Sequence, residues 1–276
     1  MNGTETQIIK LTAYESWYRN GGLATYAEVF SKYDEKEIEV ELVANRLREG
    51  LLWSAHSPVT VLDIGCGTGR FTVMLLDRVC SIRKDCLFET DLVDINPEAF
   101  ELFRVAASKA ETARITVRRT ITAPWRLVAG RDLLPPYSLI VADHVFYGEP
   151  LTHDLINGVH GLLAPEGAAI VCLQTTDSDV YRMREQAGIS TNSAENLAAL
   201  LKGCPMPVEK LDYKSRLYFN PDSHTFWDWF FATSTVDQTK QERLLETFAR
   251  LDKDGRIYLS NHASIFLIWK GGKNLE

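Results

Sequence analysis

The sequence has few cysteines, and they form none of the patterns that build disulfide frameworks or zinc sites. Its 276 residues contain five, Cys66, Cys80, Cys86, Cys172 and Cys204, an odd and scattered set without a CxxC pair. Paired or closely spaced cysteines are what both kinds of site need. We therefore expect no disulfides, no metal site and a reducing, cytoplasmic environment.

Long apolar runs are also missing. No stretch approaches the roughly 20 apolar residues that cross a bilayer. The polar segment Met1–Lys10 lacks the apolar core of a signal peptide. There is no internal repeat and no low-complexity tract. We expect a chain with no membrane partner.

Positive charge is in short supply. The 30 Lys and Arg residues are outnumbered by 37 Asp and Glu residues, which gives a formal net charge of −7. Nucleic-acid binders usually carry a broad positive field that neutralises phosphates, so we expect no nucleic-acid partner. Arg114, Arg118 and Arg119 lie close together in the sequence, and we interpret them as a solvated strand end.

The hydrophobic residues, 45% of the chain, suffice for one large core or for a core with a cap. Short apolar, β-branched segments alternate with helical patterns up to Gln174. The expected strands are 59–64, 87–95, 114–119, 137–142 and 167–173, and the helices between them include 71–79, one capped by Asn96 and Pro97, and one after Pro150. This alternation predicts an α/β fold with a Rossmann-like doubly wound sheet, mostly parallel, whose ligands bind at the carboxyl ends of the strands.

The two flanks of this pattern differ from it. Residues 14–48 have helical spacing with a break at Gly21 and Gly22. After Gln174 we expect a helix over 193–201, a strand over 208–219, an aromatic-rich helical stretch over 221–251 and a closing antiparallel strand over 256–270. The predicted domains are a helical N-terminal segment over the active site (1–57), a ligand-binding core (58–219 with 252–276) and a helical cap insert (220–251).

A glycine-rich turn, Asp63–Gly69, joins the first strand to the first helix. Its glycines allow a tight bend and a close approach to a ligand, and amides at the helix start can contact polar groups. The spacing is GxGxG, unlike the GxGxxG of nicotinamide-binding sheets. Asp94, at the end of the second strand, can accept hydrogen bonds from both hydroxyls of a ribose. Asp94 could also be a solvated turn residue, and Asp91, inside the strand, is an alternative ribose ligand.

The turn and the string Leu92-Val-Asp-Ile-Asn-Pro-Glu98 resemble the first two motifs of class I S-adenosylmethionine-dependent methyltransferases. The resemblance implies S-adenosyl-L-methionine as cofactor. The residues implied as its ligands are Asp63, Gly65, Gly67, Gly69, Asp94, Asn96, Thr122 and Ala123. The last two would lie beside the adenine, although the acidic residue common in that loop is absent. Trp125 is either a cover for the base or a buried loop residue.

Dispersed segments are similar to the histamine N-methyltransferase family: Tyr26–Phe30, Phe226–Phe230 and Gly255–Ile268. Carried over by position, the amine-binding residues of that family fall on Glu39, Asp143, Tyr147 and Asn261. The sequence departs from the pattern at Asp143, where the family has an amide, and at Val180 and Arg184, where it has tryptophans. We also take Tyr26, Phe30, Arg184 and Trp229 as candidates for binding the acceptor.

The chemistry of methyl transfer points to the same region. An amine must lose a proton before it attacks, and a carboxylate can bind the cation or accept that proton. Asp143, His144 and Tyr147 follow the fourth strand, where such groups would face the cofactor, and we take them as catalytic candidates. Asp143 could instead cap the loop, His144 could point away from it, and Glu39 could belong to a solvated helix face. His262, next to Asn261, is more simply a structural residue.

The sequence therefore predicts an S-adenosylmethionine-dependent methyltransferase of a small molecule, a monomer or homodimer, that N-methylates an amine or an amino-acid-like metabolite. If Arg184 lines the pocket, an acceptor with a carboxylate becomes attractive. Three alternatives stay open: an O- or C-methyltransferase of natural-product biosynthesis, a non-catalytic subunit that binds the cofactor, and a nicotinamide-dependent oxidoreductase, against which the GxGxG spacing argues.

Overall fold

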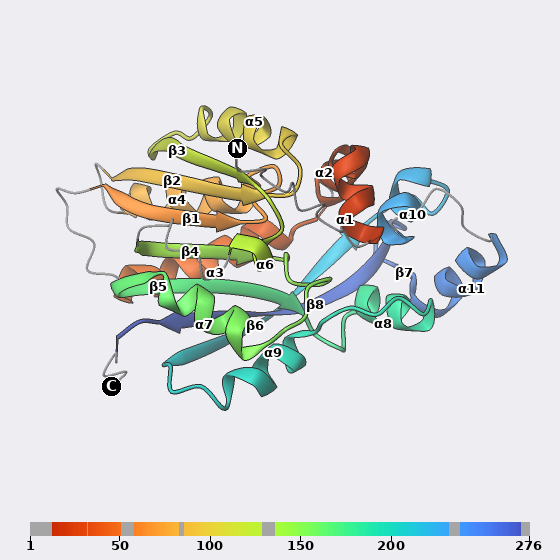
Figure 1. The fold of residues 1–276 in the computed structure, drawn as a ribbon. Coiled ribbons are helices and arrows are strands. Elements are labelled where there is room, and N and C mark those ends of the chain that lie inside the picture. The colour runs from red at the N-terminus through yellow and green to blue at the C-terminus, as the bar shows by residue number, and fades with distance from the viewer. Residues whose placement is uncertain are drawn as a thin grey trace, which may run out of the picture.

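The structure, a computed structural model, describes residues 13–31, 33–50, 58–82, 86–128, 136–231 and 238–271 (Figure 1). The strands are β1 Val59–Ile64, β2 Leu87–Asp94, β3 Arg114–Thr122, β4 Tyr137–Asp143, β5 Leu163–Gln174, β6 Val208–Tyr218, β7 Arg250–Leu251 and β8 Ile257–Trp269. The helices are α1 Ala13–Trp17, η1 Tyr18–Gly22, α2 Leu23–Phe30, α3 Glu35–Gly50, α4 Arg70–Ile82, α5 Glu98–Ala107, α6 Trp125–Val128, α7 His153–Gly161, α8 Asp179–Gln186, α9 Ala194–Leu201, α10 His224–Phe231 and α11 Gln238–Phe248.

One sheet organises the molecule. Its strand order is β3-β2-β1-β4-β5-β8-β6, with β7 paired to β8. The first five strands run parallel, and β8 lies antiparallel between β5 and β6. The order reverses beside β1, so the carboxyl ends of β1 and β4 border the crevice where such sheets bind ligands. The predicted doubly wound, mostly parallel sheet with an antiparallel last strand is confirmed.

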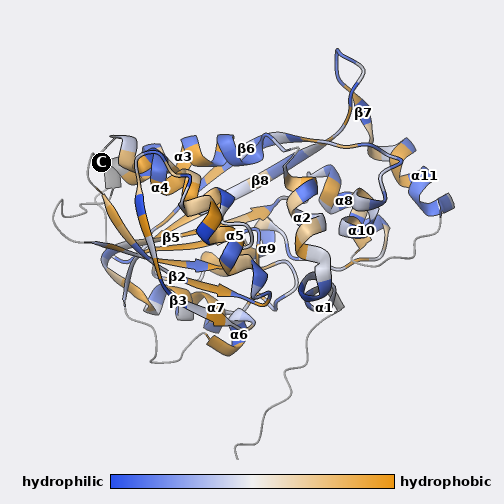
Figure 2. Ribbon diagram, turned by 90° about the horizontal axis from the view of Figure 1, so that it is seen from above, coloured by the Kyte–Doolittle hydropathy of each residue, from blue (hydrophilic) through white to orange (hydrophobic). Residues whose placement is uncertain are grey.

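Helices cover both faces of the sheet because its central strands are apolar on both sides. Along β4, Leu139 and Val141 pack with α3 and α4, whereas Ile140 and Ala142 pack with α7 and α9. Figure 2 shows the sheet between these two layers, with α3 and α4 on one side and α6 and α7 on the other. None of the helices in the described part of the chain is long and apolar enough to cross a membrane.

A third group of helices lies beyond the carboxyl ends of the parallel strands. There α2 packs against α10, and α8 contacts both α11 and β8 (Figure 1). Buried aromatic side chains join α2 and α10: Phe30 meets the edge of Trp229 at a centroid distance of 5.6 Å. Segments from the two ends of the chain thus share one aromatic core above the sheet. The division into domains stays a prediction.

The helical stretch expected over 14–48 has a second break that the periodicity did not indicate. Helix α2 ends at Phe30 and α3 begins at Glu35. Between them, Tyr33 forms an antiparallel bridge with Leu217 of β6, and the Asp34 carboxylate accepts a hydrogen bond of 2.9 Å from the Arg216 amide. This docking onto the sheet edge gives the backbone partners outside a helix. Two short helices, α6 and α8, were also not predicted.

Arg114 and Arg118 are exposed, as expected of a solvated group, but Arg118 and the half-buried Arg119 lie inside β3 rather than at its end. A register shift between Thr90 and Asp91 inserts one extra residue in β3, so that both arginines reach the same side chain. The fully buried Asp91 carboxylate accepts hydrogen bonds from Arg118 (3.0 Å), from Arg119 (2.5 Å) and from the Tyr137 phenol (2.6 Å). Asp91 therefore ties β2 to β3 and β4, and it does not line the ligand cavity described below.

The end of the glycine-rich turn shows why this chain needs glycine there. Gly69 has φ +74°, a left-handed conformation that strains other residues, and a Cβ at this position would lie 2.5 Å from Cδ2 of Phe103 in α5. Helix α4 begins at the next residue. The absence of a side chain at Gly69 therefore lets α4 start close against α5.

We expect Gly69→Ala to lower the free energy of unfolding by about 2–3 kcal/mol, measured by urea denaturation, because it adds steric overlap to backbone strain. Gly188→Ala is the matched control, since Gly188 also has positive φ (+78°) but a Cβ there would meet nothing within 4 Å. It should cost only the strain, about 1 kcal/mol. Equal losses in the two variants would show that the contact with Phe103 is unimportant.

Candidate active site

One cavity runs along the carboxyl ends of β1, β2 and β4. The glycine-rich turn contributes Asp63, Gly65, Gly67 and neighbouring residues to its wall, and the following loops contribute Asp94, Ala123, Trp125, Asp143 and His144. Tyr18, Tyr26, Phe30 and Lys36 enclose it from the side of η1, α2 and α3. A Cβ on Gly65 would lie 2.3 Å from Val145, so this glycine lets the loop after β4 close over the turn.

Asp94 lies at the cavity wall and is held by backbone amides. Its Oδ2 accepts a 2.9 Å hydrogen bond from the Gly67 amide, and its Oδ1 accepts a 2.8 Å bond from the Asn96 amide. Burial nevertheless raises the pKa of Asp94 to about 6. The carboxylate is thus positioned at the end of β2, where a ribose ligand was predicted.

Asp63 presents an unpaired polar atom to the same cavity. Burial raises the pKa of its carboxyl to about 7, against a hydrogen bond from Thr72 and with a contribution from the nearby Asp143 and Asp94. Its Oδ2 has no hydrogen-bond partner among the described residues. A cationic group in the cavity would supply the missing partner, so Asp63 suits the amino group of S-adenosylmethionine.

Three predicted cofactor ligands lie outside the cavity lining: Gly69, Asn96 and Thr122. The Asn96 side chain instead donates to the carbonyl of Tyr18 (3.2 Å) and accepts from the Glu98 amide (3.0 Å), so it caps α5. Thr122 is exposed at the end of β3. The neighbouring Ala123 does line the cavity, and its amide donates to the carbonyl of Asp94.

A buried ammonium group dominates the acceptor side of the cavity. Lys36, only 4% exposed, extends from the first turn of α3, and its Nζ lies 2.8 Å from Glu39 Oε2 and 2.5 Å from Asp143 Oδ2. Burial opposes the charge, but Asp143, Glu39 and Glu35 hold the pKa of Lys36 well above its ordinary value. The protein's own cation therefore already pairs with two of the carboxylates proposed to bind an amine.

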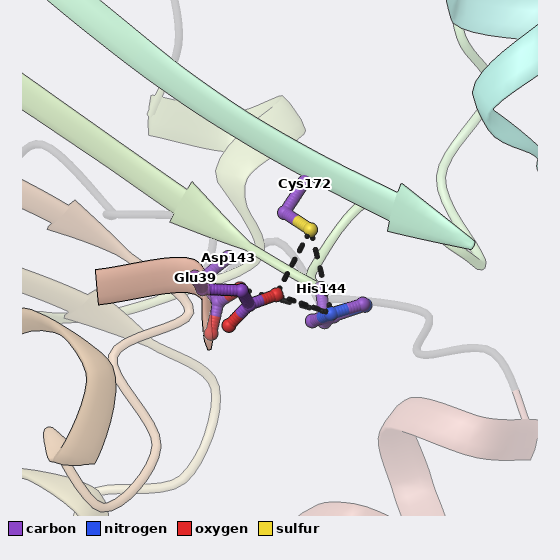
Figure 3. A group of neighbouring side chains, drawn as sticks. All are labelled: Glu39, Asp143, His144 and Cys172. Carbon is purple, nitrogen blue, oxygen red and sulfur yellow. Dashed lines mark hydrogen bonds and ion pairs between the residues drawn. The ribbon is translucent and has the colours of Figure 1, made fainter. Parts of the chain in front are cut away.

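Glu39 is buried, contrary to the alternative of a solvated helix face. Its Oε1 accepts hydrogen bonds from the Tyr213 phenol and, at 3.1 Å, from the Cys172 thiol, and it lies 3.1 Å from His144 Nε2 (Figure 3). Burial penalises the carboxylate, but Lys36 and His144 hold the pKa of Glu39 well below its ordinary value. Glu39 is thus a charged side chain that contacts several buried groups of the protein.

His144 points into this cluster rather than away from it. Strand β4 ends at Asp143, and His144 has φ +54°, so the alternation of neighbouring side chains does not apply to the pair. His144 Nδ1 bonds the Tyr147 hydroxyl, and Nε2 faces Glu39 and, at 3.3 Å, Glu35. Burial opposes protonation, but Cys172, Tyr147 and Glu35 keep the pKa of His144 well above its ordinary value.

The two oxygens of Asp143 differ in their contacts, since Oδ1 has only a 3.9 Å contact with His144 Nε2. Its Oδ2 pairs with Lys36, whereas its buried Oδ1 has no hydrogen-bond partner in the described part of the chain. Burial and the charge of Glu39 raise its pKa to about 6, against the opposing effects of Lys36 and His144. Asp143 therefore does not cap the loop, and it offers an unused acceptor at the wall of the cavity.

Four groups of the cluster resemble a metal site but do not fit one. Atoms of Glu39, Asp143, His144 and Cys172 lie within 4.8 Å of one another (Figure 3). The Lys36 ammonium already occupies the cation position between the two carboxylates.

The remaining acceptor candidates lie in two places. Tyr26 and Phe30 line the cavity, with Trp229 behind Phe30. Asn261, on β8, lies deeper: its Nδ2 donates to Glu35 and to Ser215 Oγ (3.1 Å), and its Oδ1 accepts from Ser178 (2.9 Å). It therefore orients Glu35. Tyr147 accepts a 3.0 Å bond from the Gln174 amide and contacts His144, and it does not line the cavity.

The sequence analysis missed Lys36 and Glu35, and helical spacing could have found them. The buried positions of α3 include Lys36, Val40, Val43 and Leu47, so the charged residue continues the apolar stripe by one turn. Tyr213 and Cys172 carried no comparable signal, because each sits at an inward strand position that an apolar residue could equally fill.

Comparison with known proteins identifies the family of the chain and relates its fold to solved structures. The sequence model of the methyltransferase domain family matches residues 20–216. No curated protein sequence matches the chain. The resemblance to histamine N-methyltransferases stays a prediction.

Solved methyltransferases share the fold. A putative methyltransferase from Bacillus halodurans superposes with a TM-score of 0.54 at 9% identity, covering 83% of this chain and 99% of its own. The N-methyltransferase NodS from Bradyrhizobium japonicum, solved with S-adenosyl-L-homocysteine, gives 0.52 at 14%, covering 94% and 99%. The plantazolicin methyltransferase BpumL, also solved with that product, gives 0.50 at 14%, covering 94% of both chains. The matched family, together with the glycine-rich turn, assigns the chain to the methyltransferase domain family as an S-adenosylmethionine-dependent methyltransferase.

Proposed function

We propose that this methyltransferase N-methylates a small molecule that carries a basic nitrogen. The observation that carries the proposal is Oδ1 of Asp143, a buried carboxylate oxygen that has no hydrogen-bond partner among the described residues and only a 3.9 Å contact with His144 Nε2; Asp143 lines the same cavity as Asp63 and Asp94. Buried oxygens of this kind are satisfied by N–H donors. A protonated amine supplies such donors together with the complementary charge.

On the cofactor side, the free Oδ2 of Asp63 is suited to the amino group of the methionine part, and Asp94 to the ribose. Bound S-adenosylmethionine supplies a methyl group on a positively charged sulfur, already activated for transfer to a nucleophile. The charge of Asp143 raises the pKa of Asp63, and both carboxylates line the same cavity, which supports a binding site for the acceptor next to that for the cofactor.

On the acceptor side, the balance of buried charge favours a cation. Glu35, Glu39 and Asp143 bring three carboxylates, and Lys36 and His144 bring the opposing groups. Lys36 occupies one oxygen of Glu39 and one of Asp143. Glu35 Oε2, like Asp143 Oδ1, has no hydrogen-bond partner in the described structure. An acceptor ammonium would bind through these two oxygens, whose other charged contacts, with Lys36 and with His144, are each 3.9 Å long, without displacing the lysine.

Transfer requires the lone pair of the nitrogen, so the ammonium must first lose a proton. Asp143 is the group placed to accept it at Oδ1, and its raised pKa of about 6 makes it a better base than an ordinary aspartate. His144 is less suited, since both of its ring nitrogens contact protein groups. We assign His144 to positioning Glu39 and Tyr147. Because both ring nitrogens contact protein groups, His144 is also poorly suited to act as the base in O-methylation.

The proposal is tested by product identity. The purified chain is incubated with methyl-labelled S-adenosylmethionine and a panel of primary amines, amino acids and phenols, and the labelled product is located by NMR. Label on nitrogen is the expected result. Label on oxygen or carbon would favour the alternative methyltransferases. Binding of S-adenosyl-L-homocysteine without any turnover would favour the non-catalytic subunit.

We expect Asp143→Asn to reduce kcat by about 100-fold or more, because the amide cannot accept the proton. The affinity for S-adenosyl-L-homocysteine, measured by calorimetry, should stay within about twofold of that of the unmodified chain. Asp212→Asn is the control, an exposed aspartate on β6 far from the cavity lining. An undiminished kcat in Asp143→Asn would remove Asp143 as the base.

We expect the affinity for S-adenosyl-L-homocysteine to fall by roughly an order of magnitude between pH 7.5 and pH 6, because protons compete with the ligand's amino group for Asp63. The pKa of free Asp63 is about 7, and the bound ammonium stabilises only the ionised carboxylate, so affinity is lost as the pH falls through this value. Asp63→Asn should bind weakly and with a flatter pH dependence. A dependence equally steep in the variant would assign it to another group, such as Asp94.

A further inference from the structure

Arg184 is a buried cation without an ion pair. It lies on α8, 7% exposed, beyond the carboxyl end of the sheet (Figure 1). Among the residues that the structure describes, none forms a salt bridge or hydrogen bond with its guanidinium, and its Nε is buried without a partner. Lone buried charges are costly, so a protein that keeps one usually provides a counter-charge or binds one.

Aromatic rings surround this guanidinium. Its Cζ lies 5.1 Å from the ring centre of Trp229, 5.9 Å from Phe230 and 6.0 Å from Tyr147. Cation–π contacts offset part of the lost hydration, but they leave the N–H donors of the guanidinium unused. The rings hold the group in place while its hydrogen-bonding capacity stays open.

Arg184 and Glu35 are not among the residues that line the cavity, but contacts between side chains connect the guanidinium to the acceptor side of the site. Tyr147, over whose ring it lies, bonds His144, which in turn faces Glu35 and Glu39. Tyr33 responds to both groups: burial and Glu35 raise the pKa of its phenol well above its ordinary value, and Arg184 acts in the opposite direction. Tyr33 OH and Gln174 Oε1 are further buried polar atoms without partners in the described part of the chain.

We propose that the methyl acceptor is zwitterionic, with its nitrogen at Asp143 and Glu35 and a carboxylate at Arg184. This proposal rests on the proposed N-methylation and adds the acceptor's second charged group. A carboxylate matches the planar, forked donors of a guanidinium and carries a single charge. A phosphate dianion fits less well, because the single charge of Arg184 would have to balance two negative charges, and the Glu35 carboxylate adds another to the same cluster. The acceptor class is therefore an amino acid or a metabolite that keeps its amine and its carboxylate.

The experiment compares acceptors that differ only in the carboxylate. The pairs are histidine and histamine, phenylalanine and phenethylamine, and 4-aminobutyrate and propylamine. For the unmodified chain we expect kcat/KM to be about tenfold or more higher for the carboxylate-bearing member of a methylated pair, the effect of one charged hydrogen bond. The measured quantity is this ratio, which a purely structural role of Arg184 would not change.

Arg184→Met removes the charge and keeps the hydrophobic stem, and it should bring the ratio close to one. Arg184→Lys, which keeps a cation without the fork, should keep part of the preference and shows that the site still folds. Arg182→Met is the matched control, because Arg182 is an exposed arginine of the same helix, over the ring of Phe248. It should leave the ratio unchanged.

The outcomes separate the two proposals. A chain that methylates the decarboxylated amines as well as the amino acids, or a preference that survives in Arg184→Met, overturns the carboxylate site and leaves N-methylation standing. A chain that binds S-adenosyl-L-homocysteine and transfers label only to phenols overturns the proposed N-methylation, and the zwitterionic acceptor with it.

Discussion

Burial of the Lys36 ammonium is the constraint on which the site depends. A cation at 4% exposure is tolerable only beside opposite charges, and here they come from its own helix through Glu39 and from the end of β4 through Asp143. The pairing therefore binds α3 to the centre of the sheet more specifically than the apolar stripe below it does. Glu39 also accepts hydrogen bonds from Tyr213 on β6 and from Cys172 on β5, so the strands on either side of β8 take part in one network.

The site consequently has two halves of different origin. The parallel strands β1, β2 and β4 supply the turn and the carboxylates of the cofactor side. The antiparallel strands β6 and β8, with the helices beyond the sheet edge, supply Tyr213, Asn261, Trp229 and Arg184. Asp143 is where the halves meet, with one oxygen in the internal network and the other at the cavity. The cofactor half can thus stay constant while the other half changes to suit different acceptors.

The sequence predicted the first half well because its signals are local. Strands buried on both faces appear as apolar runs, and the glycine turn needs a particular backbone that only certain residues adopt. The second half depends on tertiary contacts. The break at Tyr33 arises from pairing with Leu217, and the placement of Arg118 from a shifted register. The orientation of His144 follows from a positive φ. Helical periodicity marks Lys36 as inward-facing, but it does not show that Glu39 and Asp143 are its partners in the fold.

The position of β8 in the sheet has a consequence for how the protein is made. Although it is the last strand described along the chain, it lies between β5 and β6, and β6 has no other strand partner in the described sheet. During synthesis the five parallel strands can associate first, and the turn between β1 and α4 can form with them. Until Ile257–Trp269 has left the ribosome, the strand that carries Tyr213 lacks its strand partner and has only its contacts with α3 and with Tyr33 and Asp34. The cofactor half of the site can therefore form on a nascent chain before the half that we propose to bind the methyl acceptor.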